Sequence, residues 1–125
     1  MKAFTADLKE LAEENDDFRR VVFTGQHSQL VLMALRPGEE IGDEVHSVDQ
    51  ILYAVDGEAQ AIVAGDRFAF EKHDVVVVPA FQRHNIVNTG DEPFKLFTIY
   101  APPEHPAGTV HHTRAQAMAA ELVEV

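Results

Sequence analysis

PGEEIGDEVHSVDQILYAVDG, residues 37–57, is the stretch that decides the fold of this chain. Glu44, His46 and Gln50 share parity in a segment with the pattern of a β-strand. If that strand is roughly continuous, the three side chains project from one face. A second stretch, residues 79–88 (PAFQRHNIVN), carries a fourth donor, His84. The working hypothesis is that the two stretches together hold one metal ion.

The composition sets the kind of metal site. The chain has 125 residues and no cysteine. Disulfides, thiolate zinc sites and cysteine nucleophiles are therefore excluded, and any metal must accept nitrogen and oxygen donors. A chain of this length is expected to form one domain, residues 1–125.

The charge balance narrows the class of partner. Ten Lys and Arg against twenty-one Asp and Glu give a net charge of −11. Such a field repels phosphate backbones and anionic lipid surfaces, so nucleic acid and membrane are not expected as partners. Neither a signal peptide nor a membrane-spanning run is recognisable, which predicts a cytoplasmic protein.

Short strands at hairpin spacing dominate the rest of the chain. A capping pattern at Asp7 and Glu10 predicts a helix over residues 7–14, and one at Thr113 and Gln116 predicts a second helix over residues 114–122. Further strands are predicted, with turns between them, at residues 20–24, 29–35, 58–64, 67–71, 75–78, 83–88 and 94–100. The pattern favours an all-β sandwich or barrel of the jelly-roll kind with small peripheral helices.

The first stretch resembles the first motif of the cupin superfamily. That motif is Gly, five residues, His-x-His, three or four residues, Glu, six residues and Gly. Here the frame reads Gly38, five residues, Glu44-x-His46, three residues, Gln50, six residues, Gly57. Every spacing holds, but Glu44 stands where the first histidine usually is, and Gln50 stands where the glutamate is.

The second stretch resembles the second cupin motif, which is Gly, five residues, Pro-x-Gly, two residues, His, three residues and Asn. Here it reads His73, five residues, Pro79-x-Phe81, two residues, His84, three residues, Asn88. His73 and Phe81 replace two glycines. The resemblance covers about residues 20–100 and implies a double-stranded β-helix barrel with one copy of each motif.

The resemblance implies a variant metal site formed by Glu44, His46, Gln50 and His84. The usual cupin set of three histidines and one glutamate places one negative charge on the ion, and this set does the same. It has one imidazole fewer, and the neutral carbonyl oxygen of Gln50 is a weaker ligand than a carboxylate. The donors suit one divalent Fe, Mn, Ni, Zn or Co ion, among which the sequence does not choose.

Other histidines are expected to have lesser roles. His105 lies in a loop that could fold over the barrel mouth and is a weak catalytic candidate. His111 and His112 precede the last helix, where packing or capping is more natural than a metal site. Tyr53 and a hydroxide held by the metal are the other candidate bases, and Tyr53 has outward parity.

Parity also predicts what lines the cavity. Leu32 and Ala34, Leu52 and Ala54, and Ile86 and Asn88 should face inward, whereas Arg83 should point outward. Few charged residues are expected inside beyond the ligand set, so the metal itself would anchor an anionic substrate. For Phe81 we favour ordinary packing over a narrowed entrance.

Three functions stay open at this point. The first is a metal-dependent enzyme acting on a small oxygenated substrate, an isomerase or tautomerase or a dioxygenase. Similar small cupins with a histidine and glutamine ligand set open or tautomerise unsaturated uronates, and related ones are dioxygenases. The second is a non-catalytic small-molecule binding or sensing module, and the third is a metal-free assembly unit. Cupins usually pair through sheet edges, so a homodimer is expected.

Overall fold

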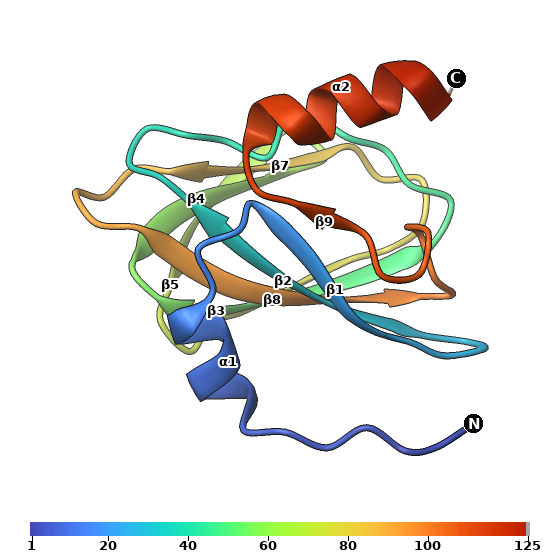
Figure 1. Cartoon of the computed structure of the whole chain (residues 1–125). Helices are drawn as coiled ribbons and strands as arrows, with labels where there is room; N and C mark the ends of the chain where they lie inside the picture. Colours follow the sequence, from blue (N-terminus) through green and yellow to red (C-terminus); the bar gives the residue numbers. More distant parts are fainter. Residues whose placement is uncertain (125) are drawn as a thin grey trace.

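The computed structural model describes residues 1–124 and shows strands gathered between two peripheral helices (Figure 1). The elements follow in chain order: α1 (Leu8–Glu14), β1 (Arg19–Thr24), β2 (Gln29–Leu35), β3 (Asp49–Asp56), β4 (Glu58–Val63), β5 (Asp66–Glu71), β6 (Val75–Val78), β7 (His84–Asn88), β8 (Phe94–Ala101), β9 (Val110–His111) and α2 (Arg114–Glu124). Neither helix of this described part is long and apolar enough to cross a membrane.

The strands form two antiparallel sheets. The larger has the order β6-β3-β8-β2-β1-β9, and the smaller has the order β5-β4-β7. Each predicted strand from residue 58 onward matches an observed one to within a residue at each end. Among residues 1–124 no ladder joins the two sheets into a closed barrel, so the jelly roll is a pair of facing sheets.

The first helix is capped as the sequence predicts. The Asp7 carboxylate accepts a hydrogen bond from the Glu10 amide at 3.1 Å, which satisfies one of the free N–H groups of the first turn. Buried Ala12 then places the helix on the outer face of the large sheet, where Leu32 and Val55 are buried with it.

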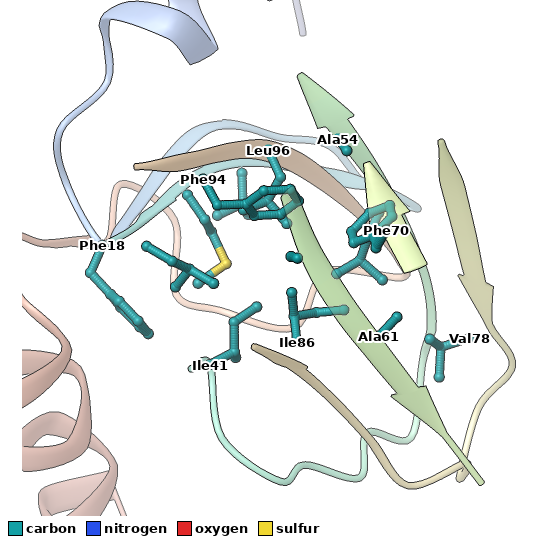
Figure 2. Close-up of a cluster of buried hydrophobic side chains, with 14 of the residues drawn as sticks. Phe18, Ile41, Ala54, Ala61, Phe70, Val78, Ile86, Phe94 and Leu96 are labelled. Atoms are coloured by element: carbon teal, nitrogen blue, oxygen red, sulfur yellow. The ribbon is translucent and has the colours of Figure 1, made fainter. Parts of the chain in front are cut away.

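The core lies between the sheets (Figure 2). Phe94 and Leu96 of β8 meet Phe70 of β5 and Ile86 of β7, and the Phe70 and Phe94 rings lie 5.4 Å apart. Leu52, Ala54, Ile86 and Asn88 are buried, as parity predicts for inward residues.

The inward prediction for Leu32 and Ala34 is wrong. Val31, Met33 and Leu35 of β2 belong to the central core, whereas Leu32 packs under α1 on the outer face. Parity holds only within one strand, and the long connection between β2 and β3 breaks its continuity.

The expectation of a continuous strand through Glu44, His46 and Gln50 is also wrong. β3 begins at Asp49, and Glu44 forms an isolated bridge with His84 of the small sheet. The chain therefore crosses from one sheet to the other between Glu44 and Gln50. The short strand β9, which pairs with β1, was not predicted either.

The second helix is capped by Thr113, whose hydroxyl accepts from the Gln116 amide at 3.1 Å, as predicted. The Gln116 side chain in turn accepts from the His112 amide at 2.8 Å. The His112 ring contacts Asp17 at 2.7 Å, so the start of α2 is attached to the segment before β1.

Two residues that replace motif glycines keep a glycine-like backbone. His73 has φ +77° and Phe81 has φ +71°, values that side-chain-bearing residues rarely adopt. The Phe81 side chain is 73% exposed, so the expectation that it packs is wrong. Its amide instead donates to the His46 carbonyl at 2.7 Å.

Candidate metal centre

Glu44 and His84 come together through their backbones. The Glu44 amide donates to the His84 carbonyl and the His84 amide to the Glu44 carbonyl, both at 2.9 Å. This pair places a residue of the β2–β3 connection directly beside the first residue of β7. These two residues are far apart in the sequence, and their side chains therefore project side by side from one face.

His46 presents one ring nitrogen to the centre and anchors the other. Its Nδ1 lies 3.1 Å from Glu104 Oε1, which fixes a proton on Nδ1. The opposite nitrogen, Nε2, is buried, lies 3.6 Å from Glu44 Oε1 and has no hydrogen-bond partner. A carboxylate behind a histidine is the arrangement that commonly orients a metal-binding imidazole.

His84 also has its Nδ1 held by a hydrogen bond and its Nε2 left without a partner, but the group that holds Nδ1 is different. Its Nδ1 lies 2.9 Å from the Gln82 carbonyl, which can only accept a hydrogen bond, so Nδ1 carries the proton. The lone pair of His84 is then on Nε2, which is buried and without a partner. The His46 and His84 ring centroids are 5.2 Å apart.

Gln50 is oriented by two hydroxyl groups. Its amide nitrogen donates to Thr98 Oγ1 at 3.1 Å and to the Tyr100 hydroxyl at 3.2 Å. Its carbonyl oxygen is buried and accepts no hydrogen bond. Because the nitrogen is engaged, the oxygen is the atom left to bind a further group.

The donor separations are compatible with one ion. One ligand atom each from Glu44, His46 and His84 lie within 4.8 Å of one another. Bond lengths of about 2.0 to 2.3 Å around one ion bring its donors within roughly 3 to 4.5 Å of each other. Gln50 is hydrogen-bonded to Tyr100, whose ring lies 5.7 Å from that of His46, so Gln50 lies in the neighbourhood of this group.

The acids around His46 change its proton affinity. Burial alone lowers the pKa of His46, but Glu44 and Glu104 more than offset this, and the net pKa is raised. A proton and a metal ion compete for the same Nε2 lone pair, so the carboxylates that attract one also attract the other.

His105 lies beside this centre, as the loop prediction suggested. It is half-buried, its Nε2 has no partner, and its ring packs edge-on against Tyr100 at 5.1 Å. Burial, helped by the charges of Arg19, His46 and His111, lowers the pKa of His105 to about 3. The ring is therefore neutral at physiological pH.

Of the remaining candidates, His111 lies at the cavity, and His112 and Tyr53 lie outside it. His111 lines the same cavity as His46, whereas His112 contacts Asp17 outside it. Tyr53 lies on the outer face, stacked on Phe97 at 5.1 Å and bonded to His73 at 3.0 Å, which agrees with its outward parity.

Sequence reasoning missed two charged residues. Arg19 is buried and, with Glu104, lines a cavity of about 300 Å³ beside Glu44 and His46, so the expected lack of interior charge is wrong. The alternation of Arg19 with buried Val21 in β1 was the available signal. Arg83, by contrast, points outward and pairs with Asp43 at 2.6 Å, as predicted.

The comparisons identify the family. The model of the cupin domain matches residues 31–100, and the chain belongs to the cupin family. The Bacillus subtilis (strain 168) protein YrkC is 42% identical over 96% of this chain and 68% of its own length.

The chain is also similar to a protein of known structure and, over a shorter stretch, to an enzyme. A Bacillus halodurans protein of known crystal structure is 38% identical, covers 94% of this chain and 95% of its own, and has a TM-score of 0.93. A shorter match, 29% identical over 49% of this chain and 18% of the relative, is to a gentisate 1,2-dioxygenase of Haloferax.

Proposed function

We propose that this cupin is a metal-dependent enzyme acting on a small oxygenated substrate, of the isomerase or tautomerase type or of the dioxygenase type. The observation that carries the proposal is the set of buried acceptors without partners: His46 Nε2, Gln50 Oε1 and His84 Nε2. Buried polar atoms are normally hydrogen-bonded. A bound cation satisfies all three acceptors together.

In this proposal Glu44, His46, Gln50 and His84 hold one divalent transition-metal ion. Two imidazoles, a carboxylate and an amide oxygen suit Fe, Mn, Ni, Zn or Co. When bound, the ion acts as a Lewis acid on an oxygen of the substrate. One negative charge from Glu44 leaves the centre cationic, which favours an anionic substrate oxygen.

The remaining residues of the cavity orient donors and handle protons. Glu104 holds the Nδ1 proton of His46, and Thr98 and Tyr100 hold the amide of Gln50. Neutral His105, with its free Nε2 at the cavity, is the residue here best placed to accept a substrate proton.

The distant dioxygenase relative supports an enzyme of the family, because it shares part of the cupin sequence. The alternative is a cupin that binds or senses a small molecule without turnover. The same metal centre would serve that role, so activity and binding must be measured separately.

The test starts from the metal content of the purified protein. We expect about one transition-metal ion per chain by mass spectrometry, and lower content in a Glu44→Ala plus His84→Ala variant. The matched control is His27→Ala plus Glu58→Ala, which changes the same residue types at exposed positions. No stoichiometric metal, with ligand binding unchanged in the first variant, would remove the metalloenzyme proposal.

Reconstitution then separates the reaction types. The chelated protein is reloaded with each candidate metal and screened for oxygen uptake in air and for tautomerisation under anaerobic conditions. Oxygen uptake alone favours the dioxygenase type, and anaerobic turnover favours the isomerase type. Ligand binding without turnover in either screen favours the binding module.

Assembly and location remain predictions. We still expect a homodimer, and sedimentation at micromolar concentration checks it; a monomer would contradict the expectation. A cytoplasmic location is checked by fractionation of the cells that make the protein.

A further inference from the structure

Arg19 is a buried cation in the wall of the candidate cavity. It is 1% exposed and is the first residue of β1, where it pairs with Met33 of β2 and with His111 of β9. The cavity that it lines, about 300 Å³, is shared with Glu44, His46 and His105. The sheet register therefore delivers a guanidinium to the same space as the candidate metal centre.

The guanidinium of Arg19 contacts two aromatic rings. Its Nη1 lies 3.3 Å from His111 Nδ1, its Cζ lies 5.4 Å from the centroid of the Phe18 ring, and its Nε is buried without a hydrogen bond. No carboxylate of residues 1–121, the part of the chain whose side chains the structure describes, lies within ion-pair distance of it. An imidazole and an aromatic face do not neutralise a guanidinium, and an uncompensated buried charge is costly.

The carboxylates of the cavity are engaged elsewhere. Glu104 faces His46 at 3.1 Å, and Glu44 belongs to the candidate metal donors. With a divalent ion bound, Glu44 neutralises only one of the two charges of the ion. The ion and Arg19 are then the two cationic positions of the cavity, and Glu104 offsets part of their combined charge without contacting Arg19.

We propose that Arg19 binds the carboxylate of the substrate, and that the substrate class is a small carboxylic acid bearing a second oxygen, a hydroxyl or carbonyl group, directed toward the metal centre. A guanidinium presents paired N–H donors that match the two oxygens of a carboxylate. The cavity volume is at the lower end of ligand sites, which restricts the acid to a small one. The part of the inference that concerns the second oxygen rests on the proposed function, because that oxygen is directed toward the metal. The carboxylate site rests on Arg19 alone.

His105 supports the same assignment. Its Nε2 is another buried polar atom at this cavity that has no partner. Arg19 Nε and His105 Nε2, a donor and a ring nitrogen without partners in the lining of one cavity, favour a polar occupant.

The test uses the metal-loaded protein and two pairs of probes that differ only in charge. Glycolate and 2-hydroxybenzoate are compared with glycolamide and 2-hydroxybenzamide by calorimetry at fixed ionic strength. We expect at least one acid to bind ten-fold or more tightly than its amide. Equal binding of acid and amide, or no binding of either acid at millimolar concentration, would overturn the proposal.

Variants assign the discrimination to Arg19. Arg19→Met should lower the preference for the acid several-fold to the level that the metal alone gives, Arg19→Lys should keep more of it, and the exposed neighbour variant Arg20→Met should leave it unchanged. A preference of the parent's size in Arg19→Met overturns the assignment. If Arg19→Met does not fold, the comparison of Arg19→Lys with the parent protein decides, because loss of the paired donors should still weaken acid binding several-fold.

The metal content distinguishes this inference from the proposed function. A protein without stoichiometric metal that still prefers acids through Arg19 contradicts the metalloenzyme and supports the carboxylate site. A metal-loaded, active protein in which Arg19→Met binds acids like the parent supports the enzyme and contradicts the carboxylate site.

Discussion

Gln50 shows how a neutral donor is held in place of a charged one. Thr98 and Tyr100 accept both protons of its amide and leave the oxygen free. Hydroxyl groups can also donate, so the same pair could hold a carboxylate. The environment of Gln50 therefore accommodates glutamate, the residue that the cupin motif usually has.

Gln50→Glu should consequently raise metal affinity. A second carboxylate adds charge attraction to the ion, and we expect the dissociation constant to fall about ten-fold, because ligand charge is a main determinant of affinity. Competition with a chromogenic chelator measures the change. Gln60→Glu, on β4 away from the centre, is the control, and an unchanged constant in Gln50→Glu would argue against Gln50 as a ligand.

Glu104 contacts His46 and would act on an ion in the proposed site through that ring. Glu104→Gln keeps the size of the side chain but weakens the hydrogen bond to Nδ1, and we expect metal affinity to fall about 10- to 100-fold. Glu121→Gln, at the rim of the same cavity, is the control and should have little effect. Equal affinity in both variants would mean that Glu104 does not orient His46.

Phe81 tests the cost of a side chain at positive φ. Phe81→Gly should relieve about 1 to 2 kcal/mol of strain and lose about 0.4 to 1 kcal/mol to unfolded-chain entropy, for a net gain of roughly 0.5 to 1 kcal/mol. Little packing is lost, since the ring is 73% exposed. Urea unfolding measures this change in the free energy of unfolding. Phe81→Ala, which keeps a Cβ, should give no comparable gain.

At the scale of elements, contacts of Asp17 connect the N-terminal strands to α2. The hydrogen bond from His112, aided by Arg20 and opposed by partial burial, holds the pKa of Asp17 below its ordinary value of 3.8. A carboxyl whose pKa is lowered on folding stabilises the folded state above its unfolded pKa, and this contribution is lost as pH falls through the folded value.

Asp17→Asn should therefore lower the free energy of unfolding at pH 7 by about 1 kcal/mol, the usual size of one such hydrogen bond. The difference from the parent protein should shrink as the pH falls below about 4, where the parent loses the charge as well. Urea unfolding at pH 7 and pH 3 checks this, with exposed Asp91→Asn as the control. A difference that is constant with pH would contradict an ionic origin.

The elements were predictable because each carries a local signal. The caps at Asp7 and Thr113 and the turns between short strands fixed the helices and most strands within a residue or two. The crossing between Glu44 and Gln50 has no local signal, because it depends on which sheet each end joins. Strand β9 has only two residues, too few for a periodicity.

The clustering of Glu44, His46 and His84 was predictable from the motifs, but their surroundings were not. Motif spacing pointed to Glu44, His46, Gln50 and His84 together, although the strand expected to run through the first three begins only at Asp49. Arg19 is placed at the cavity by the pairing of β1, and Glu104 is placed there by the loop after β8. Both lie outside the two motifs, so no motif spacing predicts them.

At the scale of the whole molecule, the candidate centre connects the two sheets. Gln50 belongs to the large sheet, and Glu44 and His84 belong to the edge of the small one. Within the described chain no ladder joins these sheets. An ion bound by all of these residues adds a cross-link that the backbone does not supply.

That cross-link has a consequence for amide hydrogen exchange. The amides of Glu44 and His84 bond to each other's carbonyls, so both exchange with solvent only when the bridge between them opens. If the bridge can open only after the ion has left, a filled metal site makes opening rarer. At a free metal concentration of about 100 times Kd, both amides should therefore exchange roughly 100-fold more slowly.

Exchange followed by NMR, with and without metal, measures this, and the amides of α1 serve as a reference. Slowing of one bridge amide without the other, or equal slowing in α1, would contradict an ion held at the bridge. Because the readout is a backbone proton, it reports equally on ions without colour or unpaired electrons, zinc among them.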